Sequence, residues 1–349
     1  MPDHPLHLPH RRRSLLLPLA WRAAAVLVAA GLLAACTGAP SGGGGAATPT
    51  GSPSAPTSAP SSPLPNPVTQ LNQVAEPAMP AAVQEVGAAA SSSDLFVVGG
   101  YNAASASTSG FYLFNGTSWS TGPSLPEAVN HPAAAVVGAA LVVAGGFTAA
   151  GATNRVFALP AGAKSWQEVP PMKRARGALT LLTVAGKLYA IGGLNGSSEV
   201  AIPEVFNPNT QAWTDLPPMP HPRDHAAGYV DGNLACVAGG REPATSVAID
   251  CFDTTTSTWQ VEASLPTATS GAAAALLGTV VVVAGGEPVP ETNLVPIVQE
   301  LHRGTWTSEP MLVPRHGTGN AVFAGRLWMC GGAIAAGVHP TTACTSIGM

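Results

Sequence analysis

The segment Leu188–Trp213 reads LYAIGGLNGSSEVAIPEVFNPNTQAW, and its pattern predicts the fold. An apolar strand ends at Gly192-Gly193, a turn follows, a second strand runs to Phe206, and Trp213 begins a third. The same pattern occurs six times along the chain, once without its tryptophan. The molecule is therefore expected to be built from six copies of one supersecondary unit.

Two markers keep the same period independently. The glycine pairs begin 46, 47, 47, 46 and 46 residues apart, and the tryptophans are spaced by 47, 47, 46 and 47 residues. The pairs are Gly99-Gly100, Gly145-Gly146, Gly192-Gly193, Gly239-Gly240, Gly285-Gly286 and Gly331-Gly332, and the tryptophans are Trp119, Trp166, Trp213, Trp259 and Trp306. A period of this size is typical of solenoids and propellers.

Each repeat predicts four short strands. In the third repeat we expect them at residues 177–186, 187–193, 199–208 and 212–220. No 3.6-residue periodicity is present, so little helix is expected. Each glycine pair ends a strand where backbones crowd, because only glycine tolerates positive φ and close approach. Each tryptophan is expected on an outermost strand, packed between neighbouring units with its N–H hydrogen-bonded.

These repeats resemble kelch repeats, which carry a hydrophobic-Gly-Gly motif, an aromatic strand ending near Asn-Pro, then Trp and Leu-Pro-Pro-Met-Pro. The resemblance covers residues 66–349 and implies an all-β, six-bladed kelch-type β-propeller with four antiparallel strands per blade. The repeats begin with a fourth-type segment, Thr69–Pro80, and end with a third-type strand. We therefore expect the N-terminal strand to complete the last blade, with Gln73 where a tryptophan is expected.

The first 65 residues differ in composition from the repeats. Residues 1–35 have the features of a signal peptide: arginines at 11–13, an apolar run at 23–33, and a small-residue ending. The ending LAAC resembles the bacterial lipobox, which implies lipidation of Cys36. A single transmembrane anchor is the alternative, although this run is shorter than the ~20 residues that a span needs. The sequence RRSLL leaves Sec and twin-arginine export both open.

Residues 37–65 contain no charged and no aromatic residue and are rich in Pro, Ser, Gly and Thr. Such a segment buries too little apolar surface to fold, so residues 36–65 are predicted to be a lipidated, disordered tether. We expect a protein exported and lipid-anchored to the outer face of the bacterial cell membrane.

The four other cysteines form an even set, as expected in an oxidising compartment. Cys236 and Cys251 fall in the second and third strands of the fourth blade, and Cys330 and Cys344 in the same strands of the sixth. Neighbouring antiparallel strands lie within disulfide reach, which predicts Cys236–Cys251 and Cys330–Cys344; two pairs of free core thiols are the alternative. Because no CxxC occurs and the histidines do not cluster with cysteines, no metal or cofactor is expected.

Ligands of proteins resembling this one bind at a mouth of the central channel, on loops that join one blade's outer strand to the next blade's inner strand. These loops carry the polar residues Asn130, His131, Arg174, Arg176, Arg223, His225, Arg315 and His316, which we predict to bind ligand. Arginine there suits a carboxylate, which its planar fork can bind in bidentate fashion. In the alternative interpretation, Arg223 and Arg315 satisfy buried loop carbonyls.

A net charge of −4 argues against nucleic acid as a partner, because phosphate binding needs a basic surface. No nucleophile, P-loop or metal-hydrolase motif appears. A copper radical oxidase, such as galactose oxidase, needs two tyrosines, two histidines and a cysteine cross-linked to tyrosine. Only Tyr101, Tyr112, Tyr189 and Tyr229 exist here, at least two of them in strand cores, and this interpretation is set aside.

We expect a monomeric, non-catalytic module that binds a protein, peptide or glycan. The alternative is a small-sugar mutarotase or epimerase, resembling the kelch mutarotase that acts on sialic acid. That enzyme needs a carboxylate near a channel-mouth arginine. Glu127 is the only clear acid that we identify in these loops, although Glu242, Glu287 and Glu291 follow glycine pairs toward one face. The loop composition therefore favours binding.

Overall fold

The computed structural model describes residues 71–349, so the predicted signal peptide, Cys36 and the tether lie outside it. Residues 71–349 form β-strands and no α-helix, as expected from the absence of helical periodicity. Within this range no helix is long and apolar enough to cross a membrane.

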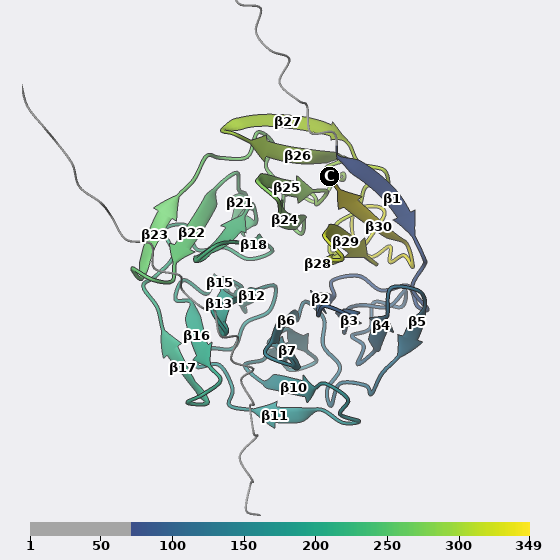
Figure 1. Cartoon of the computed structure of the whole chain (residues 1–349), viewed down its shortest axis with the longest axis vertical. Coiled ribbons are helices and arrows are strands. Elements are labelled where there is room, and N and C mark those ends of the chain that lie inside the picture. The colour runs from purple at the N-terminus through teal and green to yellow at the C-terminus, as the bar shows by residue number, and fades with distance from the viewer. Residues whose placement is uncertain (1–70) are drawn as a thin grey trace, which may run out of the picture. The chain divides into compact units, whose positions relative to one another are not determined.

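The strands form six antiparallel sheets of four, arranged as blades in a ring (Figure 1). The first three blades are β2 (Gly87–Ala90), β3 (Leu95–Val98), β4 (Phe111–Phe114) and β5 (Trp119–Thr121); β6 (Ala133–Val137), β7 (Ala140–Ala144), β10 (Val156–Pro160) and β11 (Gln167–Val169); and β12 (Thr180–Val184), β13 (Lys187–Ile191), β16 (Glu204–Asn207) and β17 (Ala212–Asp215). The last three are β18 (Ala227–Asp231), β19 (Leu234–Ala238), β22 (Ile249–Asp253) and β23 (Thr258–Val261); β24 (Ala273–Leu277), β25 (Val280–Ala284), β26 (Ile297–His302) and β27 (Thr305–Pro310); and β28 (Gly319–Phe323), β29 (Arg326–Cys330), β30 (Cys344–Gly348) and β1 (Asn72–Glu76). The predicted six-bladed β-propeller is confirmed.

Three short two-stranded hairpins supplement the blades. They are β8 (Phe147–Thr148) with β9 (Gly151–Ala152), β14 (Leu194–Asn195) with β15 (Ser198–Glu199), and β20 (Arg241–Glu242) with β21 (Ala244–Thr245). The third strand of blade 3 was predicted over residues 199–208, but β16 covers only 204–207. The tight turn Asn195-Gly196 instead pairs residues 198–199 with the segment before it.

The innermost strands explain why small residues dominate this part of the sequence. Six strands converge on the axis, and their backbones approach closely. A Cβ on Gly87 would lie 3.0 Å from the carbonyl oxygen of Pro132 in the next blade, and one on Gly319 would lie 3.0 Å from the Cβ of Ala88. Alanine and glycine there keep the six blades close to the axis.

The glycine pairs join neighbouring blades. The N–H of Gly146 in blade 2 donates to the carbonyl of Arg176 at the entry to blade 3 (2.9 Å). A Cβ on Gly145 would overlap that same carbonyl, and one on Gly146 would lie 2.8 Å from the carbonyl oxygen of Asn130. Both glycines have positive φ, as do all twelve glycines of the six pairs. The predicted combination of left-handed backbone and close approach is confirmed.

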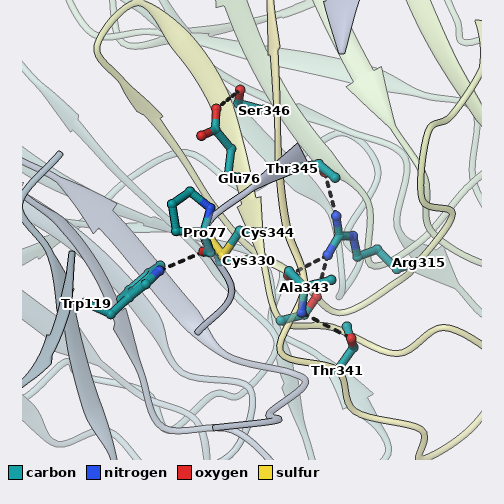
Figure 2. Close-up of a disulfide and its surroundings, with 11 residues drawn as sticks. Glu76, Pro77, Trp119, Arg315, Cys330, Thr341, Ala343, Cys344, Thr345 and Ser346 are labelled. Atoms are coloured by element: carbon teal, nitrogen blue, oxygen red, sulfur yellow. Dashed lines mark hydrogen bonds between the residues drawn. A yellow bond between two sulfur atoms is a disulfide. The ribbon is translucent and has the colours of Figure 1, made fainter. Parts of the chain in front are cut away.

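The N-terminal strand closes the ring, as predicted. β1 pairs antiparallel with β30, in register from Asn72 opposite Gly348 to Glu76 opposite Cys344. The Ser346 hydroxyl donates to Glu76 Oε1 (2.5 Å), as Figure 2 shows. Strands 270 residues apart in sequence thus form one blade.

Both predicted disulfides are present. Cys236 lies directly opposite Cys251 and Cys330 directly opposite Cys344, with Cα–Cα distances of 4.0 and 4.2 Å. The second bridge fixes β30, which carries β1, to β29 (Figure 2). A covalent bond therefore reinforces the blade at which the ring closes.

Four of the five repeat tryptophans hold adjacent blades together through their indole N–H groups. The bonds, 2.7 to 2.9 Å long, join Trp119 to the Pro77 carbonyl, Trp166 to Pro123, Trp213 to Pro170 and Trp259 to Pro217. The prediction fails for the fifth, Trp306, whose Nε1 is buried and has no hydrogen-bond partner among the described residues. In the closing blade, Gln73 occupies the tryptophan position. Its Nε2 donates to the equivalent carbonyl, that of Pro310 (2.8 Å), and its Oε1 accepts from the Leu312 N–H (2.7 Å). Gln73 therefore reproduces the polar part of the tryptophan contact.

We predict that Gln73→Ala destabilises the propeller by about 0.5–1.5 kcal/mol, because the substitution removes its hydrogen bonds to the Leu312 N–H and the Pro310 carbonyl, both at the exposed surface. Val74→Ala is the matched control, since Val74 is 38% exposed on the same strand. Urea unfolding of the two variants measures the difference. Equal stabilities would show that Gln73 contributes nothing to closure.

Candidate functional site

A closed circle of backbone hydrogen bonds surrounds one end of the channel. Each blade contributes one residue, two positions before its innermost strand, and the N–H of each residue donates to the carbonyl of the equivalent residue in the preceding blade. These six ring residues are Glu85, His131, Ala178, His225, Gly271 and Gly317, and the bonds measure 2.7 to 3.0 Å. The bond from Glu85 to Gly317 joins the first blade to the last and completes the circle.

All six ring residues have left-handed backbone conformations, with φ between 51° and 63°. This conformation costs roughly 1–2 kcal/mol at a residue that is not glycine. Four of the six are not glycine, and two of these are histidines. The hydrogen-bonded circle imposes the conformation, and strained backbone of this kind often occurs at functional sites.

The six ring residues line a cavity of about 100 Å³ at the channel mouth. Glu85, His131 and His225 bring functional side chains to this cavity, whereas Ala178 and the two ring glycines bring almost none. A Cβ on Gly317 would overlap the Glu85 carboxylate. The glycine therefore leaves the space in which the carboxylate lies.

Glu85 is the centre of the polar contacts. Its Oε2 lies 3.2 Å from His131 Nε2, and its Oε1 lies 3.2 Å from Nδ1 of His316, the residue before Gly317. The rings of His131 and His225 meet edge to face, with centroids 4.9 Å apart. Side chains from four blades thus converge on one carboxylate.

A second layer of charge lies beside this cluster. Glu287 Oε1 lies 3.4 Å from His316 Nδ1 and 2.5 Å from Arg241 Nη2. Arg241 also pairs with Glu291 (2.8 Å) and donates to the Ser270 hydroxyl (3.1 Å). Arg241 is therefore already paired with two carboxylates.

Burial and neighbouring charge act in opposite directions on these groups. Burial alone would raise the pKa of Glu85, but the facing imidazoles of His131, His316 and His225 lower it well below its usual range. Burial lowers the pKa of His131 to about 4, despite the opposing effect of Glu85. Burial would also lower the pKa of His316, but its contact with Glu85 raises it overall. At neutral pH these shifts favour a Glu85 carboxylate facing a neutral His131.

Four of the sequence-predicted ligand residues come together at this mouth: Asn130, His131, His225 and His316. Arg174 does not join them. Its guanidinium is partly exposed and forms a bidentate pair with Asp215 on the outer strand of blade 3. Glu127, the acid identified in the loops, pairs with Arg155.

Arg176, Arg223 and Arg315 occupy equivalent positions in blades 3, 4 and 6, and each is at most 1% exposed. Each guanidinium points into its own blade and donates to backbone carbonyls. Arg176 bonds the carbonyls of Gly192 and Ile202 and the Glu204 carboxylate; Arg223 bonds those of His221, Val237 and Ala248 and the Asp250 carboxylate; Arg315 bonds those of Gly331 and Ala343 and the Thr345 hydroxyl. For Arg223 and Arg315 these contacts correspond to the alternative role weighed from the sequence, and Arg176 is held in the same way; the proposals below do not use the three arginines.

Sequence analysis missed Glu85 and Asp224. Glu85 lies in the sixth inter-blade loop, which follows the closing strand β1 and so precedes the first complete repeat in the sequence. Its spacing to His131 is 46 residues, the period of the repeats, and this signal could have found it. Asp224 lies directly before His225, just as Asn130 lies before His131, and the repeated Asn/Asp-His pair is a second signal.

A larger cavity, of about 1,030 Å³, lies at the opposite ends of the inner strands. It is bordered by turns of blades 1 and 2, at residues 91–94, 138–140 and 160–164, with Phe96 and Leu113 between them. Side chains from only two neighbouring blades reach it. The mouth brings together groups from several blades, which is the usual property of a binding site.

The Kelch motif family matches residues 175–220, which is one of the six repeats. Kelch-like protein terF from Aspergillus terreus is 29% identical over 194 residues, which cover 50% of this chain and 42% of that protein. Kelch-like protein 33 from Homo sapiens is 36% identical over 78 residues, 22% of this chain and 14% of that protein. The chain therefore matches less than half the length of these curated relatives.

The solved structure of YjhT is similar in fold, with a TM-score of 0.69 and 17% identity over 78% of this chain and 97% of that one. The fold is that of a six-bladed β-propeller, and its channel mouth is polar. The motif match and the kelch-like relatives show that the repeats are similar to kelch repeats.

We predict that Gly317→Ala destabilises the protein by about 1–3 kcal/mol more than Gly271→Ala does, because only the first new methyl group displaces the Glu85 carboxylate. The two glycines make a matched pair. Both are ring residues with φ near 60°, and a Cβ on Gly271 has its nearest neighbour at 3.3 Å. Thermal unfolding measures both variants, and equal losses would contradict this position of Glu85.

Proposed function

We propose that this protein is a membrane-tethered, extracytoplasmic β-propeller that binds a protein, peptide or glycan across its channel mouth. The observation that carries the proposal is the size of the mouth cavity. Sites for small molecules usually enclose 300–1,000 Å³. The mouth encloses about 100 Å³, so a ligand must lie over it rather than enter it.

The surroundings of the mouth suit an extended ligand. The hairpins β8–β9, β14–β15 and β20–β21 follow the glycine pairs of blades 2, 3 and 4, and so lie on the mouth side of the ring. Their tips are exposed, at Ala149 and Ser197 among other residues. They therefore offer a rim of backbone and small polar groups around a polar centre, a surface suited to a macromolecular ligand.

Two features of the N-terminal sequence support the proposed cellular location. The LAAC ending supports lipidation at Cys36, and the uncharged, Pro-rich composition of the segment to residue 65 supports its role as a tether that spaces the propeller from the membrane. Lipid is the only contact with the membrane in this proposal, and the chain acts as a monomer without nucleic acid.

A small-sugar mutarotase is the second candidate, and one observation favours it: Glu85 and His131 could move a proton at the mouth. Two observations favour binding instead. The cavity is too small for a sugar ring with its substituents, and Arg241 is already paired with Glu287 and Glu291. We expect NMR anomer exchange of sialic acid to stay at the buffer rate when the protein is added.

The binding face is tested by photo-crosslinking in cells that express the full chain. A benzophenone amino acid at Ala149 or Ser197 samples the mouth, and the same amino acid at Ser92 or Lys164, on the opposite face, is the matched control. We predict discrete covalent adducts from the mouth positions only, recovered in the membrane fraction. With Cys36→Ser the adducts move to the soluble fraction.

Adducts from Ser92 and Lys164 alone would transfer the binding surface to the opposite cavity. If no position gave adducts and the protein accelerated sialic acid anomer exchange, the mutarotase function would replace binding as the proposed function. Retention of the Cys36→Ser variant in the membrane fraction would contradict the lipid anchor and favour a transmembrane one.

A further inference from the structure

Three side chains at the channel mouth have the composition of a metal-binding site. Glu85, His131 and His225 each offer one ligand atom, and these atoms all lie within 4.8 Å of one another. They come from blades 1, 2 and 4 and meet only because the backbone circle brings the ring residues together. Two imidazoles with one carboxylate are the protein ligands of His₂Glu zinc sites and of 2-His-1-carboxylate iron sites.

The hydrogen bonds of Asn130 determine which nitrogen of His131 is free. Its amide nitrogen donates to the Phe147 carbonyl (3.2 Å) and to Ser107 Oγ (2.8 Å), so its Oδ1 is the acceptor that meets His131 Nδ1 (2.5 Å). Nδ1 therefore carries a proton. Nε2 then faces Glu85 Oε2 at 3.2 Å, and two acceptors at this distance repel unless a cation or a second proton lies between them.

His225 is held in the same way. Its Nδ1 meets a carboxylate oxygen of Asp224, which leaves Nε2 available as a ligand. Metal-binding histidines usually donate their other ring N–H to a carboxylate or carbonyl oxygen, and this contact fixes the ring for the metal. The Asn130-His131 and Asp224-His225 pairs are thus two copies of one orienting device.

An independent observation comes from His316, whose side chain is 3% exposed. Neither of its ring nitrogens has a hydrogen-bond partner among the described residues. Its Nδ1 is within ion-pair distance of Glu85, but at an angle that forms no hydrogen bond. Glu287 Oε2, next to it, is also unsatisfied. Buried polar atoms are normally paired, so these atoms mark a place where a further group binds.

The space agrees with a single ion. Ligand atoms around tetrahedral Zn²⁺ at 2.0–2.1 Å are about 3.4 Å apart. Side-chain rotations that move the three ligand atoms by about 1 Å therefore bring them to bonding distance from one metal ion. The adjoining cavity of about 100 Å³ has room for a water molecule, which occupies about 30 Å³, as a further ligand.

We propose that Glu85 and the Nε2 atoms of His131 and His225 bind one divalent transition-metal ion, of the zinc class, on the propeller axis. One coordination position stays open toward the mouth. The expectation of no metal from sequence considered histidines only beside cysteines, and this cluster contains no cysteine. The proposal does not depend on whether a macromolecule covers the mouth.

The test uses the tag-free full chain in detergent, treated with a chelator and titrated with Zn²⁺ by calorimetry. We predict one Zn²⁺ per chain. His225→Asn should weaken binding more than 100-fold, and Asp224→Ala should weaken it 10- to 100-fold through loss of orientation. Asparagine suits position 225 because it tolerates the left-handed backbone. His302→Asn, in β26 of blade 5, is the control and should bind as the wild type does.

Co²⁺ provides the second readout, because its visible absorption reports coordination geometry. We expect a spectrum in the wild type and in His302→Asn, and none in His225→Asn. The metal-free His225→Asn variant should unfold at the metal-free wild-type temperature, which separates a lost ligand from a lost fold. Wild-type protein that takes up no Zn²⁺ would show that Glu85 and His131 share only a proton, and would overturn the proposal. Unchanged Zn²⁺ affinity in His225→Asn would overturn it as well.

Discussion

The circle of six backbone hydrogen bonds around the axis is the constraint on which the rest of the molecule depends. Each bond joins two blades, and the last joins residues 85 and 317, so no blade can move outward without breaking two of them. The circle fixes the backbone of each ring residue in the left-handed region. It therefore also decides which side chains reach the channel mouth.

Two further sets of hydrogen bonds between blades, both farther from the axis, support the circle. The second glycine of each pair donates to a carbonyl at the entry to the next blade, and four tryptophans donate to carbonyls of the preceding one. Both contacts use backbone acceptors, so they tolerate wide variation in the other side chains. This is why the repeats keep glycine and tryptophan while their loops differ. The loops are then free to carry the residues of a site.

Sequence reasoning found the architecture because the architecture depends on these periodic residues. The glycine and tryptophan periods predicted six blades, and the missing tryptophan predicted where the chain closes. The positions of Cys236, Cys251, Cys330 and Cys344 predicted both bridges because strand order within a blade fixes which strands are neighbours. The three short hairpins that follow the glycine pairs of blades 2, 3 and 4 were missed, and in blade 3 the tight turn at residues 195–196 shortened the third strand.

The site was only half predictable. The loops that reach the mouth could be named from the strand order, and His131, His225 and His316 are there. The same set of inter-blade loops also contains Arg176, Arg223 and Arg315, but the residue two positions before a ring residue points into its blade. A difference of two positions thus separates the mouth from the core, and composition alone does not show it. Glu85 was missed because its loop follows the N-terminal strand, whose place in the ring depends on closure.

Hydrogen exchange resolved to single amides tests the central role of the circle most directly. The account predicts that the six ring amides, from Glu85 to Gly317, exchange together and only through global unfolding, because each bond opens only when blades separate. Exposed amides of the hairpin tips, such as that of Ser197, should exchange many orders of magnitude faster. Rapid exchange at the ring amides, while the strand amides of the same blades stay protected, would contradict the account.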